Sequence, residues 1–191
     1  MKMRESGMPD AAMWHKFFDP DTILTAMALT VDVRDAVDFG CGYGTFAIPA
    51  AKRIQGTLHA FDVEPAMIEA TRCFAERKDL GNVRLHLRDF LTDGTGLAAA
   101  SVDYVMLFNI LHAEDPSRLL REAWRILAGG GHVAVIHWNY DPETPRGPPM
   151  AIRPRPADCL RWIRKAGFEI EKKHMDLPPY HYGILGRKEM A

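Results

Sequence analysis

The fold of this chain is decided at residues 37–45, which read Val37-Asp38-Phe39-Gly40-Cys41-Gly42-Tyr43-Gly44-Thr45. A hydrophobic strand runs here into three alternating glycines, whose missing side chains let a ligand approach the backbone. Further along, a second apolar segment ends in an acid at Asp62, 22 positions after Gly40. That carboxylate can accept hydrogen bonds from both hydroxyls of a ribose. A glycine turn and an acid at this spacing predict a nucleoside-binding half of a doubly wound α/β sheet.

Strands and helices alternate along most of the chain. The hydrophobic patterns predict strands at 35–39, 57–61, 83–90, 102–108, 133–137, 168–173 and 182–186, and helices at 20–29, 46–54, 65–80, 116–128 and 156–166. This alternation predicts a parallel sheet with right-handed crossovers. Nothing as long as a helix separates the last two strands, so we expect them to be antiparallel neighbours.

Glycine, proline and aromatic residues make these expectations more specific. Pro49 lies inside the helix at 46–54 and predicts a kink or a late start there, because proline cannot donate a backbone hydrogen bond. The run Gly129-Gly130-Gly131 is expected to terminate the helix that Asp115-Pro116 caps. Trp124 belongs to the apolar stripe of that helix, which predicts that it is buried in the core.

Length and composition indicate one globular domain spanning residues 1–191. Hydrophobic residues make up 47% of the 191 and charged residues 26%, as in soluble proteins. The formal net charge of −1 gives no global attraction to nucleic acid or to an anionic membrane. We expect neither a signal peptide nor a membrane span. Three scattered cysteines, and eight histidines without zinc-site spacing, predict a reduced, cytoplasmic protein without bound metal.

The glycine turn alone does not decide which nucleoside ligand is bound. A dinucleotide fingerprint would place its third glycine at position 45, where this chain has threonine, one residue after Gly44. A second mononucleotide-binding half is also missing, because the chain closes with a hairpin. Both departures argue against a nicotinamide-dependent oxidoreductase, which is kept as the less favoured alternative.

Four motifs in order give the chain a resemblance to a known family. The motifs are Asp38-Phe39-Gly40-Cys41-Gly42-Tyr43-Gly44, Phe61-Asp62-Val63, Arg88-Asp89-Phe90 and the segment 103–109 that ends in Asn109. In this order they resemble the motifs of class I S-adenosylmethionine-dependent methyltransferases, over nearly all of the chain from about residue 19. The tail of the chain, with Ile136-His137-Trp138 and Tyr180-His181-Tyr182-Gly183, is similar to small, compact prokaryotic members. The resemblance implies a seven-stranded, mostly parallel, Rossmann-like sheet whose last strand is antiparallel.

The resemblance also assigns roles to matching residues. Gly40, Gly42 and Gly44 would lie against the methionine part of S-adenosylmethionine, with Asp38 near its ammonium group. The ribose hydroxyls would be held by Asp62. Asp89 would accept a hydrogen bond from the adenine amino group, and Phe90 would contact the adenine through its backbone or as an apolar wall. Asn109 would lie near the sulfonium and the methionine.

Methyl transfer from a sulfonium does not require the protein to create a reactive group. A sulfonium methyl is already electrophilic, so positioning the acceptor and excluding water can supply about 7–11 kcal/mol of the barrier. A base is needed only where the acceptor must lose a proton. His112 and His137, at expected strand ends, are candidates for this base, and a structural hydrogen-bonding role is the alternative for each.

The acceptor is expected to be a small molecule rather than a nucleic acid. The residues after the fourth strand read Asn109-Ile110-Leu111-His112. Members of the family that methylate amino groups of DNA bases or of glutamine carry two prolines at this place, and this chain has none there. No basic stripe interleaved with aromatic residues indicates nucleic-acid binding. A module that binds the cofactor without catalysis stays open as an alternative, and the protein is expected to be a monomer or a homodimer.

Two flanking segments and one cysteine have more than one interpretation. Residues 1–18, with Trp14, form either a lid over the cofactor or a cover for a sheet edge or dimer contact. The proline-rich segment 139–156 carries three arginines, Arg146, Arg153 and Arg155, which either grip an anionic substrate or lie solvated on a stiff connection. Cys41 is interpreted as a small residue that the turn needs rather than as a redox group.

Overall fold

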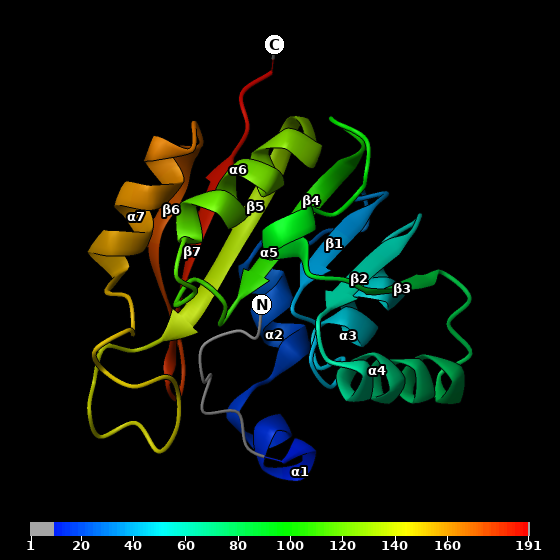
Figure 1. Ribbon diagram of the computed structural model, residues 1–191, viewed down its shortest axis with the longest axis horizontal. Coiled ribbons are helices and arrows are strands. Elements are labelled where there is room, and N and C mark those ends of the chain that lie inside the picture. The colour runs from blue at the N-terminus through cyan, green and yellow to red at the C-terminus, as the bar shows by residue number, and fades with distance from the viewer. Residues whose placement is uncertain (1–9, 191) are drawn as a thin grey trace.

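A seven-stranded sheet forms the centre of the computed structural model, which describes residues 10–190 (Figure 1). Its strand order is β3-β2-β1-β4-β5-β7-β6. The strands are β1 (Ala36–Phe39), β2 (Leu58–Asp62), β3 (Val83–Leu87), β4 (Val102–Phe108), β5 (Leu127–Trp138), β6 (Glu169–Leu177) and β7 (His181–Arg187). The first five strands are parallel, and β7 runs antiparallel to both β5 and β6. The predicted doubly wound fold with an antiparallel last strand is therefore confirmed.

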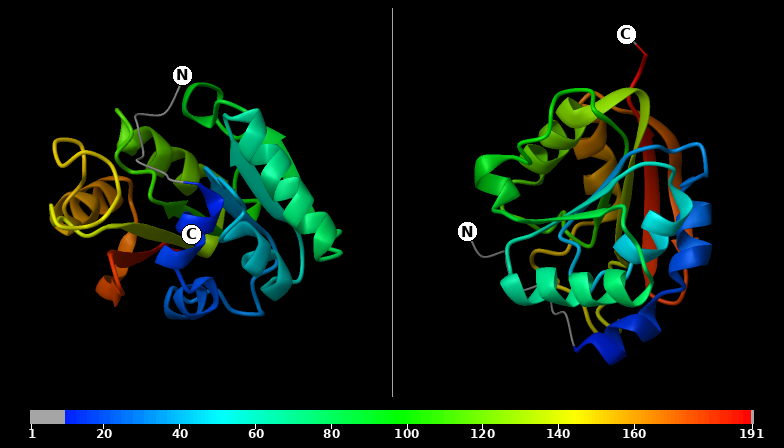
Figure 2. Two further views of the ribbon diagram at one scale, coloured as in Figure 1. Left: turned by 90° about the horizontal axis from the view of Figure 1, so that it is seen from below. Right: turned by 90° about the vertical axis from the view of Figure 1, so that its right-hand side faces the viewer.

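Helices cover both faces of the sheet, α2 and α3 on one face and α6 and α7 on the other (Figure 2). The helical elements are α1 (Ala11–Trp14), η1 (His15–Phe17), α2 (Pro20–Ala26), α3 (Ala47–Arg53), α4 (Pro65–Arg77), α5 (Phe90–Asp93), α6 (Pro116–Ile126) and α7 (Pro156–Lys165). Two apolar cores result. The strand β1 serves both, because Ala36 belongs to one core and Val37 and Phe39 to the other. The central strands are buried on both faces, as their nearly continuous apolar sequence predicts.

Capping and proline residues fix where the helices begin. The Asp115 side chain accepts a hydrogen bond from the Arg118 N–H, so that α6 starts at Pro116, whose missing N–H costs nothing at this position. Pro49 falls within the first turn of α3, which begins at Ala47. The helix begins one residue after the expected Phe46, and Pro49 lies where a missing N–H removes little from the helix.

Two expectations for the region of α6 are wrong. The glycines at 129–131 do not terminate that helix: α6 already ends at Ile126, and the glycines lie inside β5. The extended backbone is held there by the end of the chain, since Gly130 N donates to Lys188 O and Lys188 N donates to Gly131 O. Trp124 is 39% exposed rather than buried, with the Lys188 ammonium 3.8 Å from its ring centroid.

Within residues 10–190, none of the helices has the length and hydrophobicity that a membrane crossing requires.

Candidate functional site

The glycine turn after β1 is a tight bend that closes on the neighbouring strand. Gly40, Gly42 and Gly44 all have positive φ angles, of 75°, 53° and 78°. The backbone N–H groups of Gly40 and Cys41 both donate to the carbonyl of Phe61, at 2.8 and 2.9 Å. A Cβ at position 40 would lie 3.0 Å from Ile110 Cδ1. A side chain at this position would therefore be both strained and crowded.

Asp62 ends β2 and points its carboxylate at the glycine turn. Its Oδ2 accepts a hydrogen bond from Gly42 N at 2.9 Å, and its Oδ1 accepts one from Glu64 N at 3.0 Å. The residue is 7% exposed. Burial raises the pKa of Asp62, although the hydrogen bonds to the backbone of Glu64 and Gly42 oppose the increase. The two features singled out in the sequence therefore lie side by side.

Asp38 lies nearby at the end of β1 and is 3% exposed. Burial, and then the charge of Asp62, raise the pKa of Asp38 to about 7. Two carboxyl groups close together in a buried site cannot both ionise easily. A perturbed acid in such a position is typical of a binding or catalytic site.

Asp89 and Phe90 connect β3 to α5. The Asp89 carboxylate caps α5, accepting hydrogen bonds from Leu91 N at 3.2 Å and from Thr92 N at 3.1 Å. The ring of Phe90 is 3% exposed and packs edge-on against Phe39, with 5.2 Å between ring centroids. Phe90 therefore lies in the core beneath this end of the sheet, and its backbone N–H donates to Arg88 O.

Asn109 follows β4 in a left-handed conformation, with φ of 55°. Such a conformation is uncommon outside glycine and often marks a functional position. Its backbone N–H donates to Ile136 O at 2.7 Å. Both polar atoms of its side-chain amide are buried without a hydrogen-bond partner among residues 10–190.

His112 and His137 lie close together at the same edge of the sheet. Their ring centroids are 5.6 Å apart and the rings are nearly perpendicular, at 78°. They are 2% and 0% exposed. Burial, with a smaller effect from the charge of His112, lowers the pKa of His137 well below its usual value. His137 is therefore neutral at pH 7 and can accept a proton only weakly.

A third buried histidine was missed by the sequence reasoning. His181 begins β7 and pairs in register with Trp138. Its ring lies between Phe18 and Trp138, at centroid distances of 4.4 and 4.3 Å. Burial lowers the pKa of His181 to about 3. The only sequence signal for this position was the aromatic character of the segment Tyr180-His181-Tyr182.

The unpaired buried polar groups belong to segments that meet at the carboxyl ends of the central strands. Thr45 Oγ1, both amide atoms of Asn109 and both ring nitrogens of His137 and of His181 have no hydrogen-bond partner within the described part of the chain. Thr45 follows the glycine turn, and the other three lie where β4 and β5 end and β7 begins. Native proteins pair nearly all buried polar groups, so this concentration at one sheet edge indicates a place built for a ligand.

The N-terminal segment is seated over this edge by aromatic packing. Trp14, Phe17 and Phe18 are each 8% exposed. The Phe17 and Trp138 ring centroids are 5.4 Å apart, and those of Phe18 and Phe46 are 5.1 Å apart. Residues 1–9 of the expected arm lie outside the described residues. The part that is described covers the end of β5 and the beginning of β7, and its role as a lid stays a prediction.

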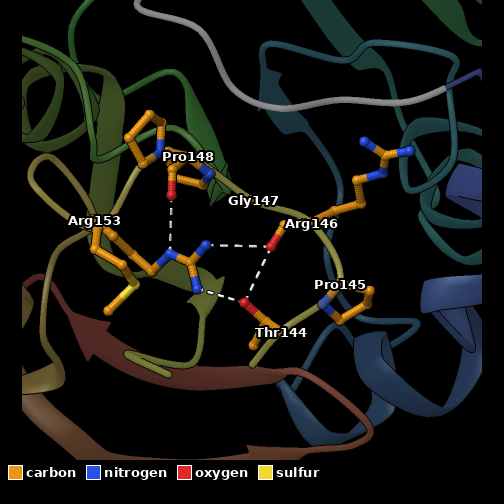
Figure 3. A pocket seen from close by; sticks show the side chains of 8 residues that line it. Thr144, Pro145, Arg146, Gly147, Pro148 and Arg153 are labelled. Atoms are coloured by element: carbon orange, nitrogen blue, oxygen red, sulfur yellow. Dashed lines mark hydrogen bonds between the residues drawn. The ribbon is translucent and has the colours of Figure 1, made fainter. Parts of the chain in front are cut away.

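The proline-rich segment folds around one guanidinium group (Figure 3). Arg153 is 8% exposed, and its side chain donates to the Thr144 hydroxyl group and to the carbonyls of Pro148, Asn139, Asp141 and Arg146. Arg153 is therefore bound within the loop rather than free to grip a substrate.

The other two arginines of this segment lie differently. The Arg155 guanidinium stacks over Tyr140, with its carbon 4.0 Å from the ring centroid. Arg146 is exposed and points away from Arg153 (Figure 3). It lines an open pocket of about 380 Å³ together with Met150 and other residues of the loop. Of the three, Arg146 and Arg155 are exposed and only Arg153 is buried.

Neither Cys41 nor the described acidic, histidine and cysteine side chains form a redox or metal site. Burial raises the pKa of the Cys41 thiol, which accepts a hydrogen bond from the Thr71 hydroxyl at 3.6 Å. A buried thiol of high pKa is unreactive. No group of three or more histidine, cysteine or acidic side chains in residues 10–190 is arranged to hold a metal ion.

Comparison with known proteins identifies the family. A family model described as a methyltransferase domain matches residues 36–131, which is half of the chain. The matched segment runs from β1 into β5 and so contains the glycine turn, Asp62, Asp89 and Asn109. The chain belongs to the class I S-adenosylmethionine-dependent methyltransferase family. The resemblance stated from the motifs is thereby confirmed.

Individual members of the family show different degrees of similarity. Aklanonic acid methyltransferase DauC of Streptomyces sp. (strain C5) is 36% identical over 123 residues, 62% of this chain and 55% of that protein. The 23S rRNA (uracil(1939)-C(5))-methyltransferase RlmD of Alcanivorax borkumensis is 40% identical over 108 residues, 56% of this chain and 23% of that protein. A solved S-adenosylmethionine-dependent methyltransferase from Aquifex aeolicus has a TM-score of 0.81 at 21% identity, covering 93% of both chains. The chain spans about half the length of the first two curated relatives it matches.

The cofactor of this family is S-adenosylmethionine, and the residues present fit it. The glycine turn leaves the backbone open, Asp62 is oriented beside it, and Asp38 is a buried acid of the right sign for an ammonium group. Unpaired amide atoms at Asn109 lie at the end of the adjacent strand β4. These donors and acceptors match a ligand that carries ribose hydroxyls and an amino acid.

Proposed function

We propose that this protein transfers the methyl group of S-adenosylmethionine to a small-molecule acceptor, leaving S-adenosylhomocysteine. The observation that carries the proposal is the set of unpaired buried polar side chains at the sheet edge where the glycine turn meets Asp62. Open α/β sheets bind ligands at this edge, outside the carboxyl ends of the strands. A second observation, the family match over residues 36–131, supports the cofactor.

Each cofactor contact is proposed from the position of the residue. The turn at Gly40, Gly42 and Gly44 would lie against the methionine moiety, and Asp38 would pair with its ammonium group. Asp62 would accept hydrogen bonds from the ribose hydroxyls, using the lone pairs that Gly42 and Glu64 leave free. The adenine amino group would donate to Asp89, above the ring of Phe90, and the Asn109 amide would face the sulfonium end.

The main contributions of the protein to the reaction would be to position the reactants and to exclude water from the site. The bound sulfonium supplies an electrophilic methyl group, and the acceptor must be held in line behind it. Buried aromatic rings, among them Phe18, Phe46 and Trp138, exclude water from this end of the sheet. Orientation of this kind can lower a barrier by about 7–11 kcal/mol.

His112 and His137 are the proposed proton acceptors where the acceptor needs one. His137 is neutral, buried and without a hydrogen-bond partner in the described chain. A neutral imidazole can accept a hydroxyl proton as the oxygen attacks. The low pKa of His137 suits an acceptor whose own hydroxyl is acidic, because proton transfer to a weak base then remains feasible.

A small molecule is favoured over a macromolecule by the cover on the site. The described N-terminal residues and the loop anchored by Arg153 both lie at the end of β5 and the beginning of β7. The name of one relative, aklanonic acid methyltransferase, concerns a small acceptor, whereas the rRNA methyltransferase shares only 23% of its length with this chain.

The test is binding followed by transfer. Calorimetry should detect binding of S-adenosylhomocysteine at micromolar concentrations. In a second experiment, the methyl group of labelled S-adenosylmethionine should be transferred to members of a panel of hydroxyl-bearing small molecules. Absence of binding would contradict the proposal. Binding without transfer to any acceptor would favour a module that senses the cofactor, and binding of NAD instead would favour an oxidoreductase.

A further inference from the structure

Asp38 is a buried acid for which the described chain provides no partner. The residue is 3% exposed, and no side chain or backbone group within residues 10–190 hydrogen-bonds to its carboxyl group. Its neighbours in register are Ala60 on β2 and Met106 on β4, which carry no charge. A buried carboxylate in such surroundings is costly unless it is paired or neutralised.

The charges around Asp38 favour its neutral form. The titratable groups coupled to it are Asp62 at the end of β2 and Cys41 in the turn, and none of the cations in the described chain acts on it. The basic residues of α3, Lys52 and Arg53, lie in the last turn of that helix, where Arg53 is bound to Asp21.

Asp62 is the member of the pair that keeps its charge. It accepts hydrogen bonds from two backbone N–H groups, those of Gly42 and Glu64, and these favour the ionised form. Asp38 has no such donor among residues 10–190. The proton that the pair retains near neutral pH therefore resides on Asp38.

We propose that cofactor binding displaces a proton from Asp38, so that the affinity for ligands with an α-ammonium group falls as the pH is lowered. This inference rests on the proposed function, in which that ammonium group lies beside Asp38. The balance is simple: the carboxylic acid and the ammonium ligand combine to a carboxylate–ammonium pair, and one proton passes to solvent. An ion pair would stabilise the carboxylate in the complex, whereas no donor or cation of residues 10–190 stabilises it in the free protein.

The size of the effect follows from the free protein. Its Asp38 has a pKa of about 7, and pairing with a cation moves the pKa of this group far below that value. Linkage then makes the apparent affinity about 30-fold weaker at pH 5.5 than at pH 8.5. Binding should release about half a proton at pH 7 and about one proton at pH 5.5.

Calorimetry with S-adenosylhomocysteine tests the proposal. The dissociation constant is measured at pH 5.5, 7.0 and 8.5, and the binding enthalpy at pH 7.0 in phosphate and in Tris, whose ionisation enthalpies differ. We expect the affinity loss given above and a buffer-dependent enthalpy that reports proton release. The control ligand is 5′-methylthioadenosine, which lacks the ammonium group and should show neither effect.

Two variants assign the proton. Asp38→Asn resembles the protonated acid in shape, and its affinity should be weak and independent of pH, converging with that of the wild type at pH 5.5. Asp89→Asn should weaken binding but keep the pH dependence of the wild type. Thermal unfolding checks that both variants fold. If Asp38→Asn does not fold, the comparison of the two ligands on the wild-type protein still tests the proposal.

The outcomes separate this inference from the proposed function. Tight binding of S-adenosylhomocysteine with the same affinity at all three pH values and no proton release would overturn the inference and leave the function standing. A pH dependence that persists in Asp38→Asn would also overturn it. No binding at any pH would contradict the function itself, and the inference with it.

Discussion

Asp62 and Gly42 are joined by a hydrogen bond of 2.9 Å, donated by the backbone N–H of Gly42 to Oδ2 of the carboxylate. This bond ties the end of β2 to the turn after β1, although the residues are 20 positions apart in the sequence. With Glu64 N on the other oxygen at 3.0 Å, the carboxylate is held in one orientation before any ligand arrives. Such preorganisation lowers the cost of binding.

Replacing Asp62 by asparagine should weaken cofactor binding strongly. The variant keeps the size of the side chain but loses the charge that strengthens a hydrogen bond to a ribose hydroxyl. Charge-assisted hydrogen bonds contribute about 1.5–3 kcal/mol, so we expect a loss of about 10- to 150-fold in S-adenosylhomocysteine affinity by calorimetry. Asp79→Asn, at an exposed position after α4, is the control and should bind like the wild type. Unchanged affinity in Asp62→Asn would remove the ribose contact from the account.

Alanine at position 40 should destabilise the fold. Gly40 has a φ of 75°, and a Cβ there would approach Ile110 Cδ1 to 3.0 Å. The left-handed conformation alone costs about 1–2 kcal/mol for a residue with a side chain. Urea denaturation should show a loss of that size. The matched control is Gly81→Ala, where a Cβ would meet nothing within 4 Å, and equal losses in both variants would refute the role of the turn geometry.

Phenylalanine in place of His181 should make the protein less sensitive to acid. The pKa of His181 is lowered to about 3 by burial, below the value of about 6.5 in an unfolded chain. The unfolded state therefore binds more protons, and stability falls as the pH drops below about 6.5, by about 1.4 kcal/mol per pH unit. The variant should gain more over the wild type at pH 5.5 than at pH 8, as measured by thermal unfolding. An equal difference at both pH values would contradict a neutral buried His181.

Lysine in place of Arg153 should loosen the proline-rich loop. A lysine ammonium group cannot reproduce the planar set of donors that reaches four carbonyls and the Thr144 hydroxyl group. We expect a loss of about 2–3 kcal/mol in unfolding free energy and faster trypsin cleavage after Arg146. In the control, Arg155→Lys, only the contact with Tyr140 changes, so little effect is expected. Wild-type cleavage rates in Arg153→Lys would show that the loop does not depend on this guanidinium group.

The sequence predicts most of the sheet because local patterns and long-range order agree there. Alternation of strands and helices gives the parallel part, and the short connection between the last two strands gives the antiparallel pair. The glycines at 129–131 mislead because β5 is extended by pairing with Lys188, a partner far away in the sequence. Trp124 misleads because Lys188 covers its ring at the surface.

The site is predicted less completely. Strand ends could be placed from the sequence, and with them Asp38, Asp62, Asn109, His112 and His137. The environment of His181 could not be, since it depends on Phe18 from the N-terminal segment and Trp138 from β5 meeting in space. The fate of Arg153 was equally hidden, because its partners are backbone carbonyls of the loop, which carry no sequence signal.

A crystal structure of the protein with S-adenosylhomocysteine tests the central claim most directly. We predict that both ribose hydroxyl groups lie within hydrogen-bonding distance of the Asp62 carboxylate, and that the amino acid end of the ligand lies against the turn formed by Gly40, Gly42 and Gly44. Density for the ligand elsewhere on the molecule would contradict it.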